Sequence, residues 1–276
     1  MKKNIFLVII LFFFQSQAQK ISGKIVDKEN EPIKNARVGI ESEEIGDISD
    51  ENGNFQIDFS NIEKNKNLKV VVSEFQPFEI KISDFINSAH QIILKEKFIN
   101  IEPVIINPKK YILRNFGTSN SKTNYCGYDS EKKDKIFNEY AIKISNKRHL
   151  KIKNINVNIV NFKLNKPAVL IFDIQNAKNG FPDDSQSLAN ETLKLELTED
   201  DIRNNKVSLN VEDKNIWTNQ DFFVLVRVDE NLDGRLYFGG NIFAFSKNTY
   251  YRNYFGDWKK FSVGEPSINV DVLIQK

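Results

Sequence analysis

Two short stretches near the start of the chain decide its fold: residues 21–27, ISGKIVD, and residues 49–55, SDENGNF. In the first stretch Ile21, Gly23 and Ile25 alternate with polar residues, and a period of two predicts a half-buried β-strand. The second stretch holds an Asn-Gly pair ending at Gly53, which accepts the positive φ of a tight turn. Phe55 follows that turn and begins another apolar alternation. The pattern predicts β-strands joined by tight turns.

The residues up to about 95 continue this pattern of short runs separated by turn residues. Pro32 marks a turn, because it fixes φ and cannot donate to a ladder. Alternation then buries Ala36, Val38 and Ile40, and later Phe55 and Ile57 together. Further runs at 68–73, 78–82 and 91–94 bring the total to about seven strands. No helical periodicity of useful length occurs.

This segment resembles the carboxypeptidase regulatory-like domain, a transthyretin-like β-sandwich. The resemblance lies in the runs 22–27 (SGKIVD), 31–33 (EPI), 36–38 (ARV) and 49–55, with Gly46 between them. Ile48 and Ser49 stand where a Thr usually precedes the Asp, and residues 75–78 (FQPF) lack the usual Gly-Tyr. The resemblance implies a domain that is not catalytic and brings no active-site residues.

Residues 1–18 have the three parts of a secretory signal peptide. Lys2 and Lys3 precede an apolar run over residues 5–14, and Ser16 and Ala18 are the small residues that a signal peptidase reads. A run of about ten residues is too short for a membrane-spanning helix, which needs roughly twenty. We therefore expect cleavage after Ala18 and export to the periplasm, the outer-membrane periphery or the medium, with no transmembrane segment in the mature chain.

Charge argues against a nucleic-acid partner. The chain has 39 Lys and Arg against 37 Asp and Glu, and removal of residues 1–18 lowers the formal net charge from +2 to zero. The Lys-Lys pairs at 109–110, 132–133 and 259–260 are scattered, whereas a nucleic-acid interface needs a clustered basic face.

The single cysteine, Cys126, cannot form an internal disulfide. It is a reactive or intermolecular thiol, or a small apolar residue that packs; the absence of flanking basic residues favours packing.

The rest of the chain is expected to form a connector and a second domain. Residues 98–135 are rich in Ser, Asn, Thr and Lys beyond a short apolar run at 101–106, which predicts irregular chain. Residues 136–276 show about nine alternating runs and no helix to cover a parallel sheet, which favours an antiparallel jelly-roll-like sandwich. We thus expect an all-β protein with a signal peptide (1–18), a regulatory-like domain (19–97), a connector (98–135) and a β-sandwich domain (136–276). The two halves should fold separately.

No catalytic constellation is evident. The two histidines, His90 and His149, fall in different expected domains, and neither has a nucleophile beside it as acyl-transfer chemistry requires. Phosphate-loop, nucleophile-elbow and zinc-protease motifs are missing from the sequence. Paired carboxylates of a glycosidase are set by the fold rather than by spacing, so they stay open. We expect no catalytic residues, no enzyme activity and no cofactor.

One loop could hold calcium. Asp229, Asn231 and Asp233, followed by Gly234, match the first half of a calcium-binding loop. Gly240 stands where the bidentate Glu should be, and the loop joins two expected strands. A plain Asp-Gly turn explains the same residues, and we favour it over a weak calcium site.

An aromatic cluster is the remaining candidate site. Residues 250–258 (YYRNYFGDW) carry five aromatic rings, and Tyr250, Tyr254 and Trp258 have the same parity in an extended chain. Exposed together, they could stack on sugar rings; alternatively the rings enter the core, which is the more common case. In the first interpretation Tyr251 and Phe255 point to the core.

The sequence therefore predicts an exported, non-catalytic binding or structural module of the cell envelope. Its partner would be an envelope protein or a glycan, in the setting of surface glycan or outer-membrane assemblies. The pairing of domains, with the Trp258-Lys-Lys run, resembles a recurring class of exported bacterial two-domain proteins. A glycoside hydrolase, or an accessory protein to one, using carboxylates of the second domain is the alternative.

Overall fold

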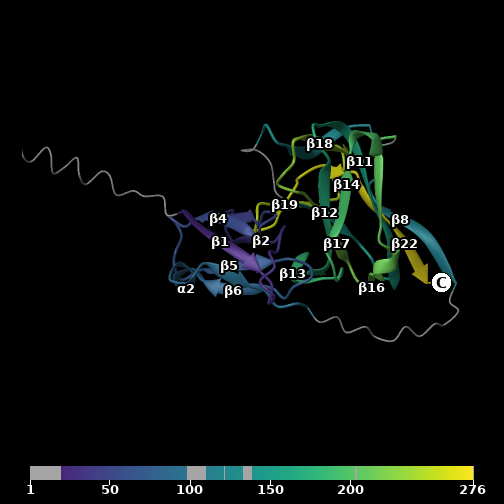
Figure 1. Ribbon diagram of the computed structural model, residues 1–276. Helices are drawn as coiled ribbons and strands as arrows, with labels where there is room; N and C mark the ends of the chain where they lie inside the picture. Colours follow the sequence, from purple (N-terminus) through teal and green to yellow (C-terminus); the bar gives the residue numbers. More distant parts are fainter. Residues whose placement is uncertain (1–19, 98–109, 121, 133–138, 203, 276) are drawn as a thin grey trace, which may run out of the picture.

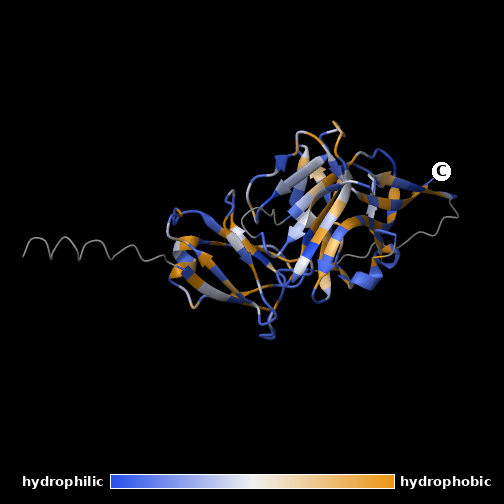
Figure 2. Cartoon of the chain, turned by 90° about the horizontal axis from the view of Figure 1, so that it is seen from above, coloured by the Kyte–Doolittle hydropathy of each residue, from blue (hydrophilic) through white to orange (hydrophobic). Residues whose placement is uncertain are grey.

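The structure is a computed structural model that describes residues 20–97, 110–120, 122–132, 139–202 and 204–275 (Figure 1). The expected signal peptide lies outside the described residues. Strands dominate both halves, so the all-β class is confirmed. Figure 2 shows polar and apolar residues alternating along the strands, as expected where one face of a sheet packs on a core. Within the described ranges no helix is both long and apolar enough to cross a bilayer.

The N-terminal sandwich consists of two small sheets. The first sheet has the strand order β4-β1-β7 and the second β3-β2-β5-β6. The first sheet contains β1 (Lys20–Val26), β4 (Asn54–Asp58) and β7 (Gln91–Ile93). The second contains β2 (Arg37–Ile40), β3 (Gly46–Ile48), β5 (Asn67–Val71) and β6 (Phe78–Lys81).

The predicted alternation is confirmed in the core between these sheets. Ile25, Val38, Ile57 and Leu68 are almost wholly buried there. One expectation was wrong: the run at 78–82 stops at Lys81, and residues Ile82–Ile86 form a short helix, α2. Ile82 and Phe85 are three apart, so one face of this helix buries both of them in the core.

The second half is a larger antiparallel sandwich. One of its sheets has seven strands, in the order β13-β12-β17-β10-β19-β20, with β14 also paired to β12. Its members are β10 (Glu139–Ile144), β12 (Ala168–Lys178), β13 (Phe181–Ser187), β14 (Leu193–Leu197), β17 (Phe222–Val228), β19 (Thr249–Arg252) and β20 (Lys259–Lys260).

The other sheet has eight strands. Its order is β21-β18-β11-β22-β8, with β15 and β16 paired to β11 and β9 paired to β18. Its members are β8 (Tyr111–Gly117), β9 (Asn124–Asp129), β11 (Leu150–Leu164), β15 (Lys206–Asn210), β16 (Trp217–Thr218), β18 (Gly234–Asn241), β21 (Glu265–Pro266) and β22 (Ile268–Gln275). The core between the two large sheets includes Phe172, Phe238 and Val270.

The prediction of an irregular connector over residues 98–135 was wrong in part, because two strands lie within it. Within residues 98–135, β8 pairs with β22 over seven residues and β9 pairs with β18. Both strands are edge or near-edge strands, which tolerate polar residues on their solvent face, so the polar composition hid them. Two short 3-10 helices, η2 (Glu199–Asp201) and η3 (Glu212–Lys214), lie between strands. Thr198 is the N-cap residue of η2, and its backbone N–H donates to Asp201 Oδ2 at 2.7 Å.

Candidate functional site

The three aromatic residues predicted as a glycan-binding face do not share one exposed surface. Tyr250 is only 2% exposed, and its hydroxyl donates to the Gly180 carbonyl at 3.1 Å. Trp258 is half-buried, with the Arg252 guanidinium 4.0 Å from the centre of its ring. Tyr254 lies against Gly46 of the N-terminal sandwich. The interpretation of these residues as one sugar-stacking face is therefore wrong.

The backbone explains this error. Strand β19 ends at Arg252, and Tyr254 has a φ of 46°, so the parity of an extended chain does not continue to Trp258. Tyr251 packs on Phe261 at the edge of the second core, as predicted. Phe255 is buried as well, but it packs against the N-terminal sandwich rather than the core of its own domain.

Two glycines of the N-terminal sandwich make room for these rings. A Cβ atom at Gly39 would lie 2.9 Å from Cδ2 of Phe255, and one at Gly46 would lie 2.7 Å from Cγ of Tyr254. The Arg37 guanidinium lies 4.4 Å from the centre of the Phe255 ring, within the range of a cation–π contact. The loop after β19 is thus seated on strands β2 and β3.

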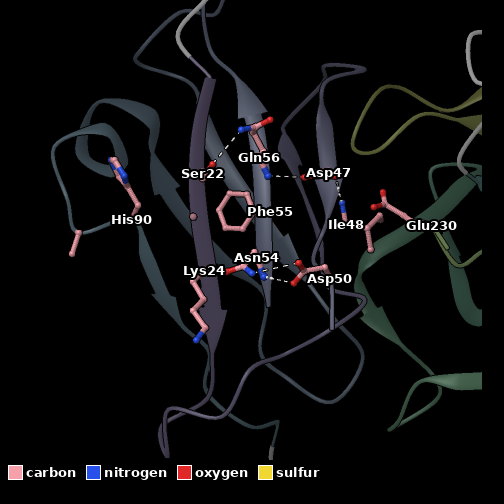
Figure 3. Close-up of a pocket in the computed structure, with 12 residues that line it drawn as sticks. Ser22, Lys24, Asp47, Ile48, Asp50, Asn54, Phe55, Gln56, His90 and Glu230 are labelled. Carbon is pink, nitrogen blue, oxygen red and sulfur yellow. Dashed lines mark hydrogen bonds between the residues drawn. The ribbon is translucent and has the colours of Figure 1, made fainter. Parts of the chain in front are cut away.

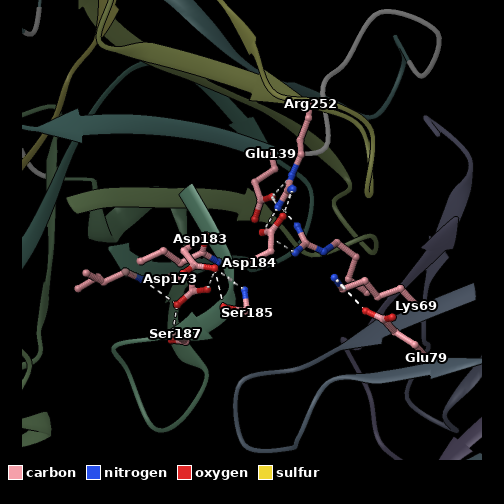
Figure 4. Close-up of polar contacts among 12 residues, drawn as sticks. Lys69, Glu79, Glu139, Asp173, Asp183, Asp184, Ser185, Ser187 and Arg252 are labelled. Carbon is pink, nitrogen blue, oxygen red and sulfur yellow. Dashed lines mark hydrogen bonds and ion pairs between the residues drawn. The ribbon is translucent and has the colours of Figure 1, made fainter. Parts of the chain in front are cut away.

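A buried cluster of four charged residues joins the two sandwiches beside this loop (Figure 4). Arg37 of β2 donates to Glu139 of β10 at 2.5 Å, and Arg252 of β19 donates to the same oxygen from Nε at 2.9 Å. Arg252 also pairs with Asp184 of β13 through two nitrogens, and Arg37 lies 3.4 Å from that carboxylate. Two arginines and two carboxylates balance in charge, which burial of ions requires.

The electrostatics follow from this geometry. Burial alone would raise the pKa of Asp184, but the charge and hydrogen bonds of Arg252 outweigh burial and hold that pKa below its usual range. Burial opposes the charge of Arg252 too, yet Glu139 and Asp184 raise its pKa. Asp184 and Arg252 are therefore both ionised at neutral pH, and the Asp184 carboxylate is not poised to exchange a proton.

Two further contacts extend the interface. Both oxygens of the Glu74 carboxylate accept hydrogen bonds from Thr192, at 2.8 Å from its backbone N–H and 2.7 Å from its hydroxyl. Arg227 of β17 donates to the Asn35 carbonyl at 2.8 Å. The two sandwiches therefore meet through buried, directional contacts rather than through a loose polar surface.

Two hollows meet at Glu230 on this interface. One, of about 670 Å³, is an open depression along β1 and β4, bordered by Asp47, Asp50 and Gln56, with Glu230 facing it from the second sandwich (Figure 3). The other, of about 570 Å³, lies between the sandwiches. Its lining is largely acidic: Asp129, Asp229, Glu230 and Asp233, with Arg227 as the cation and Tyr128 and Tyr254 as walls.

Glu230 has the most perturbed carboxyl of these hollows. Burial, and then the nearby charge of Asp47, raise its pKa to about 7, although Glu230 as a whole is exposed to solvent. Burial likewise raises the pKa of Asp47. Carboxyls from the two sandwiches therefore face each other across the interface, and repulsion between them grows as both ionise.

The remaining candidate nucleophiles and bases have structural surroundings. Nε2 of His90 lies 3.1 Å from the Ile86 carbonyl, and the His149 ring stacks on Trp217 at 4.8 Å. Cys126 is buried in the second core, and burial raises the pKa of its thiol, which disfavours the reactive thiolate. Cys126 pairs with Phe238 on strand β18, so it packs within the sandwich.

The candidate calcium loop has the hydrogen bonds of a turn. Asp229 Oδ1 accepts from the Asn231 backbone N–H at 2.9 Å, and Asp233 Oδ1 accepts from the Asn165 side chain at 2.8 Å. Gly234 has a φ of 128° and begins β18. Among the described residues, no group of three or more His, Cys, Asp or Glu side chains is placed to hold a metal ion.

Fold and interface define a two-sandwich, all-β protein. Residues 21–106 match the family of the CarboxypepD_reg-like domain. The N-terminal sandwich is therefore a domain of this family, as its sequence motifs predicted. The match runs past residue 97, where we expected the domain to end, into residues outside the described ranges. No curated protein matches the chain.

Solved structures add little to this assignment. Two structures of infectious bursal disease virus, one of the T13 particle and one of the Gx strain, are each 9% identical to the chain, with TM-scores of 0.24. They cover 93% and 87% of this chain, which spans 61% and 60% of theirs. Similarity at this level carries no argument about function.

Proposed function

We propose that the mature protein is an exported, non-catalytic binding or structural module of the cell envelope. The observation that carries the proposal is the buried cluster of Arg37, Glu139, Asp184 and Arg252. In this cluster the charged groups buried at the interface pair with one another, and these ion pairs hold the two sandwiches together. Acid–base chemistry needs a carboxyl poised near the working pH, and the arginines hold Asp184 fully ionised. Residues 1–18 supply the export signal in this proposal.

The partner would be an envelope protein or a glycan, bound on the outer surfaces of this joined body. Sequence charge supports the choice, because a mature chain without net charge has no general attraction for nucleic acid. A joined pair of domains also presents its surfaces in one fixed relation, which lowers the entropic cost of binding an extended partner.

Fractionation of the native host tests this proposal. The protein, tagged at its C-terminus, should be found in the envelope or the medium and should retain a defined partner after gentle solubilisation. A matched form without residues 1–18 should stay in the cytoplasm and retain none. Recovery of the full-length protein from the cytoplasm, with residue 1 intact, would refute the proposal.

The hollow at Glu230 supports a second candidate, the glycoside hydrolase. A carboxyl with a pKa near 7 beside other carboxylates is the pairing that such enzymes use for their acid and base. Release of reducing ends from polysaccharides by the mature protein, lost in Glu230→Gln but kept in the exposed control Glu51→Gln, would establish this function and displace the first. Equal background from all three proteins would dismiss it.

A further inference from the structure

The eight-stranded sheet has an outer face, turned away from the core, that takes no part in the contacts described above between the two sandwiches. The strand register places its residues in rows. Trp217, Lys151, Leu273 and Leu113 form one row across β16, β11, β22 and β8. Four-stranded rows at about 4.8 Å spacing extend about 14 Å. The face lies on the side of the second sandwich away from the N-terminal one (Figure 1).

Aromatic rings gather at one end of this face. The Tyr111 and Trp217 rings lie 6.2 Å apart, and His149 stacks nearly parallel on Trp217, with 11° between the ring planes. Tyr111 is 42% exposed and the neighbouring Leu113 is 56% exposed. Trp217 is half-buried, with His149 stacked on its ring and the Lys151 ammonium 5.9 Å from the ring centre, so Tyr111 is the more accessible of the two rings. An accessible aromatic side chain presents an apolar face with a polar tip, which suits ligands of the same mixed character.

A row of amides and a carboxylate follows directly along the strands. Asn115, Asp271, Asn154 and Asn210 are opposite one another on β8, β22, β11 and β15. Asp271 accepts hydrogen bonds from Asn115 at 2.8 Å and from Asn154 at 3.2 Å, so these side chains are held in place. An amide both donates and accepts hydrogen bonds, and hydroxyl groups do the same.

The charges of the face are few and of both signs. Lys151 stands in the aromatic row, Asp271 in the amide row, and Lys206 on β15 is close enough to Asp271 to lower the pKa of that carboxyl. The face therefore has no concentration of one sign that would complement a polyanion or a polycation. The platform is open rather than concave: none of the hollows described above involves its residues. Small molecules are usually bound in enclosed pockets, whereas an open row of sites suits a polymer.

We propose that this outer face binds an uncharged polysaccharide, with sugar rings stacked on Trp217 and Tyr111 and hydroxyl groups bonded to the row of Asn115, Asn154 and Asn210. The inference rests on the proposed function as a binding module, and it names the ligand class and the surface. The face replaces the hairpin of Tyr250, Tyr254 and Trp258, whose rings are taken up by the core and the interface.

Affinity electrophoresis of the mature protein in gels containing dextran, xylan or galactomannan tests the proposal. At least one of these neutral glycans should retard the wild type. Trp217→Ala should weaken that binding roughly tenfold, the loss expected for one stacking contact of about 1.4 kcal/mol. Tyr111→Ala, at an exposed position on an edge strand, should weaken it severalfold without unfolding the protein, which keeps the test valid if Trp217→Ala folds poorly.

Phe243→Ala is the matched control, because Phe243 is 75% exposed and lies on the loop after β18, outside the face. Its binding should equal that of the wild type. Retardation by none of the three glycans, retardation only by the polyanion alginate, or an equal loss in Phe243→Ala would overturn the proposal. Glycan retardation that is unchanged in Trp217→Ala and Tyr111→Ala, with envelope association intact, would leave the proposed function standing but remove this face. Glycan binding without envelope association would support this face but refute the proposed function at the envelope.

Discussion

Glu139→Gln should separate the stabilities of the two sandwiches. The Glu139 carboxylate is buried and receives hydrogen bonds from Arg37 at 2.5 Å and from Arg252 at 2.9 Å. The substitution keeps the size of the side chain but removes its charge. Two buried guanidinium groups would then share the single carboxylate of Asp184.

The expected cost is about 3–5 kcal/mol of unfolding free energy, the usual penalty when one partner of a buried ion pair is removed. The penalty is high because the remaining arginine charge stays buried: Arg252 is only 2% exposed. A whole domain is stabilised by only about 5–15 kcal/mol, so the loss is large enough to change the unfolding mechanism. We expect one unfolding transition in the wild type and two in the variant.

Urea unfolding followed by tryptophan fluorescence measures this effect. Trp258 stacks on Arg252 and reports on the interface, whereas Trp217 reports on the far sheet. Glu51→Gln is the control, since its ion pair with Lys34 is exposed and worth at most about 1 kcal/mol. A loss in Glu139→Gln no larger than in this control would refute the reasoning that the cluster joins the domains.

Four further outcomes are expected. Mass spectrometry of the mature protein should show cleavage after Ala18; an intact N-terminus in the exported pool would count against it. Trp258→Ala should cost about 3 kcal/mol in urea unfolding, because the half-buried ring packs against Arg252, and should leave any glycan retardation unchanged. Glu230 has a raised pKa of about 7 against 4.5 for the free group, so its unfolded form ionises first. Stability should therefore fall as pH rises from 4.5 to 7, and Glu230→Gln should flatten that slope; an unchanged slope would contradict the assignment. A chelator should leave the melting temperature unaltered in the wild type and in Asp233→Ala; a drop that only the wild type shows would reveal a calcium site.

Local pattern predicted the elements whose side chains alternate between core and solvent. Ile21, Gly23 and Ile25 are buried on one face of β1, as expected from their spacing. The turn before Phe55 forms because Asp50 accepts hydrogen bonds from two backbone N–H groups, and Gly53 takes a φ of 75°. In such segments the sequence period and the tertiary environment agree.

The candidate site could not be predicted in the same way. Arg37, Glu139, Asp184 and Arg252 are far apart in the chain, and each resembles an ordinary polar strand residue until the fold brings them together. The aromatic run failed for a local reason, since the left-handed backbone at Tyr254 ends the alternation. Ion pairs between residues far apart in the chain produce no periodic pattern in the sequence. A single residue with positive φ is enough to end an alternation of buried and exposed side chains.

Strands β8 and β9 also decide where the chain can be divided. A fragment beginning at residue 136 would lack both, leaving the edges of β22 and β18 without their partners. It would also lose Tyr128, whose buried hydroxyl donates to the Val226 carbonyl at 2.8 Å. Unpaired edges invite intermolecular pairing. Such a fragment should aggregate, whereas one beginning at Lys110 should stay monomeric, so expression trials of the second sandwich should start upstream of Tyr111.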